Sequence, residues 1–444
     1  MAITSRLLAI ERLFGQRLDQ IDESSLDRLV STEQRETDQL DFKSKWTVSA
    51  DADELRKDVC AFANSRGGLI IYGVRDEESK AVELTPFEAT TDFRNQVAGI
   101  LFSGCRPTPR FELTQLESSR SPGRYYVLLA VPQSSEAPHA RLKDVKQEHM
   151  LNFPLRVETI TRFMSESELA ARYRARFQAD AERSERTSEL EQSFPIDGGS
   201  SQLSLAMRFC GVPSAAGEAR IGSELINTWY ERIRLLSDGT RSFGCPPHLD
   251  ASQLRYRRRA IRIGSDDDYV EFYSDGSTVA HSVLVPPANV MGLDRYPGQP
   301  VCIQQRFVAV RIAALHSIAA DFAVEGAGAS GDLTTRISLV GARPEHGTPR
   351  PVLITSLRNG MQMPVSGAQP AFDACAESIA PLDILCGRSS AHTVESWRRS
   401  IDELSNCFGL SGSDLFLDAE IAFDQWDQDA ATVRRWADDL EVLR

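Results

Sequence analysis

Residues 36–76 constrain the fold of this chain more than any other stretch, because strand, helix and turn patterns follow one another there without a gap. Residues 40–43 alternate apolar and polar side chains, which predicts a short strand. Residues 51–63 begin with a capping-box pattern and carry one apolar face, which predicts a helix. Residues 64–68 end in paired glycines and predict a sharp turn. The apolar run 69–74 then predicts a buried strand.

The polar side chains of this unit are expected to gather at one place. Asp41 and Lys43 point to the same face of their strand, because side chains alternate along a strand, and the apolar residues around them point to the core. Asp76 follows the end of the buried strand and reaches Asp41 if the two strands are neighbours. Glu36 lies on the approach to the first strand.

Three carboxylates and a lysine form a set that suits phosphodiester chemistry. Mg²⁺ and Mn²⁺ take oxygen ligands, and such a metal activates water and neutralises charge on a phosphodiester. We therefore predict Glu36, Asp41 and Asp76 as metal ligands, and these three acids together with Lys43 as catalytic residues. The alternative stays open at this point: Asp41 and Lys43 as a same-face ion pair, and the acidic residues 76–78 as a polar hairpin turn.

The order of these motifs resembles the AlbA-like domain of the Schlafen family. Members read roughly Glu, four residues, (Asp/Glu)-Phe-Lys, then a helix, Ala-Phe-Ala-Asn-x-x-Gly-Gly, and a strand that ends Gly-Val-x-Asp. All of these positions occur here in that order, and the resemblance covers about residues 20–178. It implies a metal-dependent endoribonuclease site at Glu36, Asp41 and Asp76, acting on structured RNA such as tRNA. The family often has Glu where this chain has Asp41.

The resemblance also implies which residues bind nucleic acid and which shape the turn. Asn64, Gly67 and Gly68 supply the unusual backbone angles of the turn. A later family motif is matched in part by residues 153–161, where Glu158 stands in place of a usual glycine. The predicted nucleic-acid contacts are Lys43, Lys45, Arg75, Arg106, Arg156 and Arg162, with a place at the rim of the core as the alternative for Arg156.

Charge is distributed unevenly along the chain. The net charge of −13 argues against a protein that coats nucleic acid without specificity. Residues 1–180 hold 25 basic and 28 acidic residues, whereas residues 181–444 hold 25 and 35. Within residues 101–176 the count is 12 basic to 8 acidic, which is the pattern of a nucleic-acid surface or of an ordinary solvated face.

Other compositional signals exclude several classes of protein. The 8 cysteines are scattered without a Cys-x-x-Cys pair, so neither a zinc site nor a disulfide framework is expected. No phosphate loop of the Gly-x-x-x-x-Gly-Lys-(Ser/Thr) type occurs, which argues against ATP hydrolysis. No apolar run approaches the ~20 residues of a membrane span, and the charged N-terminus does not resemble a signal peptide, so we expect a cytoplasmic protein without membrane contact.

The whole chain is expected to be α+β. We predict a first domain over residues 1–178 with N-terminal helices and a mixed sheet, a linker over 179–201 and an α+β domain of unknown function over 202–444. Within this last domain the expected strands are 202–209, 256–263, 269–273, 278–285, 337–340 and 351–354, and the expected helices are 218–236, 301–324 and 393–408.

Three functions follow from these observations. The first is a nucleic-acid-binding protein of Schlafen type that acts as a Mg²⁺- or Mn²⁺-dependent endoribonuclease. The second is a DNA-binding transcriptional regulator, with structural carboxylates and no cofactor. The third is a dimerising interaction module. Since Schlafen-type enzymes pair two lobes of this kind and the chain has one, the resemblance implies a homodimer.

Overall fold

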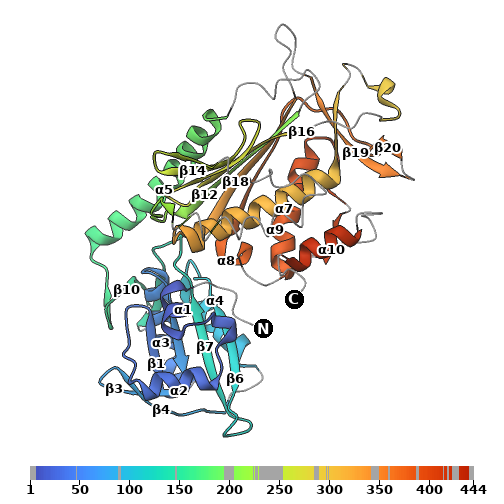
Figure 1. The fold of residues 1–444 in the computed structure, drawn as a ribbon. Helices are drawn as coiled ribbons and strands as arrows, with labels where there is room; N and C mark the ends of the chain where they lie inside the picture. Colours follow the sequence, from blue (N-terminus) through green and yellow to red (C-terminus); the bar gives the residue numbers. More distant parts are fainter. Residues whose placement is uncertain are drawn as a thin grey trace. The chain divides into compact units, whose positions relative to one another are not determined.

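The fold was analysed in a computed structural model (Figure 1). The structure describes residues 7–46, 48–88, 92–145, 148–194, 205–223, 225, 229, 254–284, 290–296, 298, 300–341, 350–358, 361–386, 390–413, 415–417, 420–422 and 430–439. The chain divides into two compact units, Met1–Asp180 and Ala181–Arg444.

The first unit begins and ends with helices, and strands and two further helices lie between them. Its elements are α1 (Leu8–Phe14), η1 (Leu18–Gln20), α2 (Glu23–Ser31), β1 (Leu40–Lys43), α3 (Val48–Ala63), β2 (Gly68–Tyr72), β3 (Val74–Glu77), β4 (Lys80–Leu84), α4 (Phe93–Gly104), β5 (Cys105–Arg106), β6 (Glu112–Glu117), β7 (Tyr125–Val131), β8 (Ala140–Val145), β9 (Glu148–Asn152), β10 (Pro154–Val157), β11 (Ile160–Phe163) and α5 (Glu166–Gln192), which continues into the second unit.

The first unit is built in three layers around a four-stranded sheet of order β1-β2-β7-β6. β1 and β2 are parallel because helix α3 crosses between them, whereas β7 is antiparallel to β2 and to β6. Strand β2 is buried throughout, and its residues alternate between two apolar layers. Helices α1 and α2 cover one face of the sheet, and α3 and α4 cover the other (Figure 1).

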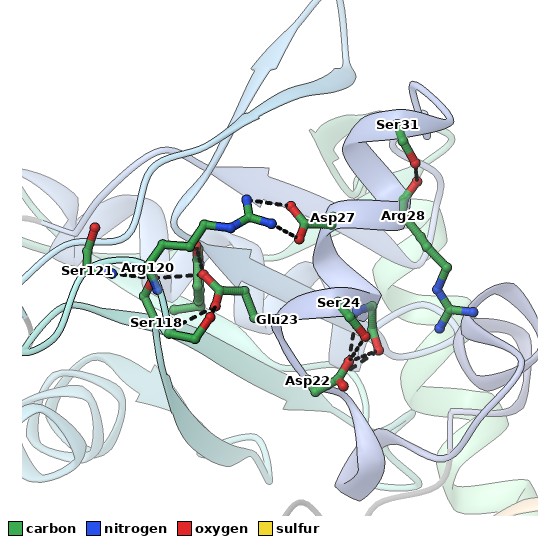
Figure 2. A network of polar contacts seen from close by, with 12 residues as sticks. Asp22, Glu23, Ser24, Asp27, Arg28, Ser31, Ser118, Arg120 and Ser121 are labelled. Atoms are coloured by element: carbon green, nitrogen blue, oxygen red, sulfur yellow. Dashed lines mark hydrogen bonds and ion pairs between the residues drawn. The ribbon is translucent and has the colours of Figure 1, made fainter.

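A buried carboxylate fixes helix α2 to the sheet (Figure 2). Glu23 accepts hydrogen bonds of 2.7 Å from the Ser118 hydroxyl, 2.7 Å from the Ser119 amide and 2.9 Å from the Tyr126 hydroxyl. Burial by itself raises the pKa of Glu23, but the hydrogen bonds from the two serines and Tyr126 outweigh it and lower the pKa to about 2. The charged form of Glu23 therefore stabilises the docking of α2.

Two further contacts define helix α2. Asp22 caps its N-terminus by accepting a 2.8 Å hydrogen bond from the Ser25 amide, and the two residues form a capping box. Asp27 pairs with Arg120, whose Nη1 lies 2.9 Å from Asp27 Oδ1, and Figure 2 shows both branches of the guanidinium facing the carboxylate. Helix α2 is thus held at its start and on its flank.

The second unit is also α+β. Its elements are β12 (Leu205–Ala215), β13 (Leu254–Arg257), β14 (Ala260–Gly264), β15 (Asp268–Tyr273), β16 (Thr278–Leu284), η4 (Leu293–Arg295), β17 (Val301–Gln304), α7 (Gln305–Asp321), η5 (Phe322–Gly326), β18 (Ser330–Gly341), β19 (Val352–Arg358), β20 (Met361–Pro364), β21 (Ala374–Pro381), α8 (Leu382–Leu385), α9 (Ser390–Asn406), β22 (Phe416–Leu417), β23 (Glu420–Ile421) and α10 (Ala430–Asp439).

A seven-stranded sheet of order β13-β14-β15-β16-β12-β18-β21 dominates the second unit. Helix α7 lies against one face. There His316 Nε2 and the Thr335 hydroxyl of β18 share a 3.0 Å hydrogen bond, and the His316 ring contacts the ring of Phe209 of β12. The C-terminal part of α5 lies against the other face, where Leu190 and Phe194 join the apolar cluster. The helical segment Gln305–Gly326 is long and apolar enough to cross a membrane, but 89% of its apolar 18-residue window is buried, as in the core helix of a globular unit.

The α+β fold class is confirmed, and several boundaries differ from the sequence prediction. Helix α5 runs through residues 179–192 of the predicted linker, and residues 195–201 of that linker lie outside the described part of the chain. The predicted helix 301–324 begins with strand β17, since a short apolar run does not distinguish strand from helix. Most of the predicted helix 218–236 lies outside the described residues.

Candidate functional site

Strand β1 directs its polar side chains toward helix α3. Leu40 and Phe42 lie in the apolar layer that α1 and α2 cover. The alternation of the strand turns Asp41 and Lys43 to the opposite face, as the sequence predicts. Asp41 is only 3% exposed there. A buried carboxylate needs cationic or hydrogen-bonding partners, and the structure supplies two cations.

Each oxygen of Asp41 faces a different cation. Oδ1 lies 3.0 Å from Nη2 of Arg156, which is 7% exposed in β10. Oδ2 lies 2.5 Å from Nζ of Lys43. Arg156 also lies over the ring of Phe62, 5.4 Å from its centroid. Both side chains that we predict to contact phosphate at this point are therefore engaged with Asp41 instead.

Asp58 of helix α3 completes the group of charges, and sequence reasoning missed it. Its Oδ2 lies 3.6 Å from Lys43 Nζ, and its Oδ1 lies 3.8 Å from Lys57 Nζ. Asp58 is buried, because it stands next to Val59 and one turn after Leu55 on the apolar face of α3. An acidic residue within an apolar helix stripe is the signal that could have identified it. We call Glu36, Asp41, Lys43, Asp58 and Arg156 the Asp41 cluster.

Glu36 reaches the cluster from the chain before β1. Its Oε1 accepts a 2.9 Å hydrogen bond from the Phe42 amide, and its own amide donates to the Ser79 carbonyl at 2.8 Å. Burial and then the negative charge of Asp41 raise the pKa of Glu36. Glu36 therefore both closes the backbone around β1 and adds a third carboxylate beside Lys43.

The electrostatics of the cluster reflect carboxylates that lie close together in a buried place. Burial and then the charge of Asp41 raise the pKa of Asp58 to about 7, although Lys43 and Lys57 oppose the shift. Burial by itself lowers the pKa of Lys43, but Asp41 and Asp58 outweigh it and raise that pKa above its usual range. Lys43 is thus held as a cation between the two aspartates.

Asp76 lies apart from the main sheet. Gly73 has a φ of 96°, which ends β2 at Tyr72, and the chain continues as β3, which pairs with β4 in a separate two-stranded sheet. Asp76 is exposed in β3. Asp76 thus follows the end of β2, whose neighbour in the sheet is β1, and its approach to Asp41 stays a prediction.

The predicted turn residues hold three segments together. Asn64 is fully buried, and its side chain accepts from the His139 amide at 2.6 Å and donates to the carbonyls of His139 and Pro154 at 2.8 Å each. Gly67 has a φ of 75°, and a Cβ there would lie 2.7 Å from backbone atoms of the segment after β7. At Gly68 a Cβ would lie 2.4 Å from the Phe62 ring.

The remaining predicted nucleic-acid contacts differ in whether a carboxylate pairs with their positive charge. Arg75 Nε lies 2.9 Å from Glu83 Oε2, and Arg162 Nη1 lies 2.8 Å from Glu168 Oε2. Arg106 is exposed, and its Nη1 donates to the carbonyls of Phe102 and Cys105. Lys45 is exposed. Within the described residues, neither Lys45 nor Arg106 forms an ion pair with a carboxylate, so their charges are available at the surface.

The donor set does not form a ready metal site in the described part of the chain. No group of three or more His, Cys, Asp or Glu side chains there is placed to hold a metal ion. Both oxygens of Asp41 already face cations, and Lys43 stands where a metal shared with Asp58 would have to enter. The prediction of Mg²⁺ or Mn²⁺ therefore stays a prediction, and no catalytic step is derived from it.

Comparison with known families agrees with the motif order around the Asp41 cluster. The family model described as Schlafen, AlbA_2 matches residues 36–164. Residues 36–164 are therefore similar to a Schlafen AlbA_2 domain. The match confirms the resemblance deduced from the sequence, and no family model matches the C-terminal half. A Schlafen AlbA_2 domain points to nucleic-acid binding in general, and no specific activity follows from it.

Comparisons with individual proteins add little. A search of curated proteins found no match. Among solved structures, the N-terminal domain of a RecG-related protein from Nitrosomonas europaea is 13% identical, with a TM-score of 0.23, and the match covers 33% of this chain and 95% of that one. A Corynebacterium diphtheriae protein is 14% identical, with a TM-score of 0.22, and the match covers 71% of this chain and 65% of that one. At such TM-scores neither structure carries an argument about this protein.

Proposed function

We propose that this protein binds nucleic acid through its Schlafen AlbA_2 domain. The observation that carries the proposal is the family match over residues 36–164, which spans the four-stranded sheet and helices α3 and α4 of the first unit. The excess of basic residues within 101–176, 12 to 8 in a chain of net charge −13, supports it. The Asp41 cluster serves here as an internal clamp that joins β1, α3 and β10.

The pairing of the predicted contacts supports an assignment of two of them to phosphate. Lys43 and Arg156 are committed to Asp41, and Arg75 and Arg162 are paired with glutamates at the surface. Lys45 and Arg106 keep exposed cations without a carboxylate partner in the described residues. We propose that these two contact the phosphate backbone, because an unpaired surface cation gains the most from a phosphate.

Fluorescence anisotropy with labelled tRNA and duplex DNA tests this assignment in the full chain. Lys45→Gln and Arg106→Gln should each weaken binding and should each reduce the slope of log affinity against log salt by about 1. Arg75→Gln and Arg162→Gln are matched controls, since they remove the same charge from acid-paired residues. Equal losses for all four variants would contradict the assignment, and no binding by the wild type would contradict the proposed function.

Metal-dependent cleavage of structured RNA is a second candidate function. One observation favours it: Glu36, Asp41 and Asp58 surround a single lysine, and the charge of Asp41 raises the pKa of both other carboxyls. A divalent cation would relieve this repulsion, although it must compete with Lys43 for Asp41. Calorimetric titration with Mn²⁺ and incubation with tRNA test the candidate. If the titration shows no heat of Mn²⁺ binding and tRNA is not cleaved in a way that EDTA abolishes, nucleic-acid binding without cleavage is the remaining function.

Homodimer formation also stays a proposal. It derives from the pairing of two lobes in Schlafen-type enzymes, where this chain has one recognisable copy. Light scattering of the purified protein measures the mass directly. A strict monomer across a wide range of concentrations would contradict a homodimer.

A further inference from the structure

The second unit carries a dense group of arginines on one β-hairpin. Strands β13 and β14 are joined by a two-residue turn, Arg258 and Arg259. Residues 254–264 hold five arginines and no acidic residue, whereas residues 181–444 as a whole hold 25 basic and 35 acidic residues. We call residues 254–264 the arginine hairpin. Its charge is opposite to that of the unit that carries it.

The arginines of the hairpin are only partly neutralised. Arg255 is directly opposite Arg262 in the strand register, and like charges at such positions repel one another. Arg262 Nε lies 2.8 Å from Glu271 Oε2, and Arg255 Nη1 lies 2.7 Å from Asp266 Oδ1. Arg257 Nε approaches Glu271 only to 4.0 Å. Two acids thus face three arginines along the strands.

The turn leaves two more charges at the surface. Arg258 and Arg259 are exposed, and within the described residues neither forms an ion pair with a carboxylate. Arg259 has a φ of 58°, a conformation in which glycine and asparagine are favoured over arginine. Local backbone preference therefore does not account for an arginine at this position.

An aromatic side chain stands among these charges. Tyr256 lies between Arg255 and Arg257 and is 57% exposed. The hairpin is at the edge of the seven-stranded sheet, because β13 is its terminal strand. Arginine forks match phosphate oxygens in two-pronged contacts, and tyrosine hydroxyls are among the groups that hydrogen-bond the phosphates of a duplex.

We propose that the arginine hairpin is a second nucleic-acid-binding site of this protein, formed by Arg255, Tyr256, Arg257, Arg258 and Arg259, and that it contacts the phosphate backbone of a duplex. The inference rests on the proposed function, because the same polymer is the ligand of the Schlafen AlbA_2 domain. It gives a role to the unit that no family model matches. Nucleic acid is favoured over an acidic protein partner because the exposed tyrosine is interleaved with arginines.

Binding of labelled duplex DNA by the full chain tests the hairpin, with anisotropy measured over a range of salt. Arg258→Gln/Arg259→Gln should weaken binding about 10-fold at low salt and reduce the slope of log affinity against log salt by roughly 2, about 1 for each phosphate contact. Arg398→Gln/Arg399→Gln is the matched control, since these adjacent arginines of α9 pair with acids of the same helix. The control should bind as the wild type does.

Four outcomes would overturn the inference. If the two double variants bind alike while the wild type binds well, the hairpin is not a site although the proposed function stands. If the wild type binds no nucleic acid, both fail together. If Arg258→Gln/Arg259→Gln leaves affinity unchanged but promotes aggregation, the arginines only protect an edge strand from pairing. Binding to phosphatidylserine vesicles in place of DNA would likewise overturn it.

Discussion

Asp41 and Arg156 form a buried ion pair of 3.0 Å that joins strand β1 to strand β10. The two residues are separated by 115 positions, so the pair closes most of the first unit into one structure. Asp41 is predicted as a metal ligand and Arg156 as a nucleic-acid contact, and in the structure the two side chains pair with one another. The stability of the first unit should therefore depend on Asp41 more than on any exposed acid.

Removing Asp41 should strongly destabilise the protein. Asp41→Ala leaves the buried guanidinium of Arg156 without its carboxylate, and breaking a buried pair from one side costs about 3–5 kcal/mol. The free energy of unfolding in urea measures the loss. Asp76→Ala is the matched control, because Asp76 is exposed and its loss should change stability by less than about 0.5 kcal/mol. Equal effects of the two variants would contradict the clamp.

Asp58 should make the protein less stable as pH rises from 3.8 to about 7. Its pKa is raised from 3.8 to about 7 in the folded state, so the folded state binds more protons than the unfolded chain between those values. Unfolding free energy therefore falls from pH 3.8 to about 7 because of this group and is flat above. Asp58→Asn removes this contribution, so the variant should be the more stable protein above pH 7. A variant that is less stable at every pH would contradict this.

Glu23 should have the opposite effect on stability: because of this residue the protein should become less stable as pH falls below 4.5. Its pKa is lowered from 4.5 to about 2, so its charged form adds stability that is present above pH 4.5 and is lost as pH falls toward 2. Glu23→Gln should cost about 1–3 kcal/mol at neutral pH. The difference in unfolding free energy from the wild type should shrink below pH 4.5. A difference independent of pH would assign the loss to packing alone.

Asn64 should be the most sensitive polar residue of the turn after α3. Asn64→Ala leaves one buried amide and two buried carbonyls, those of His139 and Pro154, without partners, which costs on the order of 3 kcal/mol. Thermal and urea unfolding measure this loss of unfolding free energy. The exposed Asn95, which donates to Asp92, provides the control, and Asn95→Ala should lie within about 0.5 kcal/mol of the wild type.

Local patterns predicted the elements of the first unit and which face each side chain takes. The alternation at residues 40–43 placed Asp41 opposite the core layer of Leu40, because a strand has a fixed period of two. The same rule says nothing about partners from distant segments. The pairing of Asp41 with Arg156 depends on how β10 packs against α3, and no local signal in either strand encodes that contact.

Two other differences have specific causes. Asp76 follows the buried strand as predicted, but the positive φ of Gly73 turns the chain there into the separate hairpin of β3 and β4. Asp58 was not predicted, because the apolar stripe of a helix identifies its buried face and does not identify an acid within that face.

The most direct test of nucleic-acid binding is a salt titration of the full chain with labelled tRNA, single-stranded DNA and duplex DNA. The account predicts a complex at low salt whose log affinity falls linearly as log salt rises, with a slope that reports the number of phosphates neutralised. It also predicts that Asp41→Asn, if folded, retains the complex. Failure of the wild-type protein to bind any of the three nucleic acids at low salt would contradict the account.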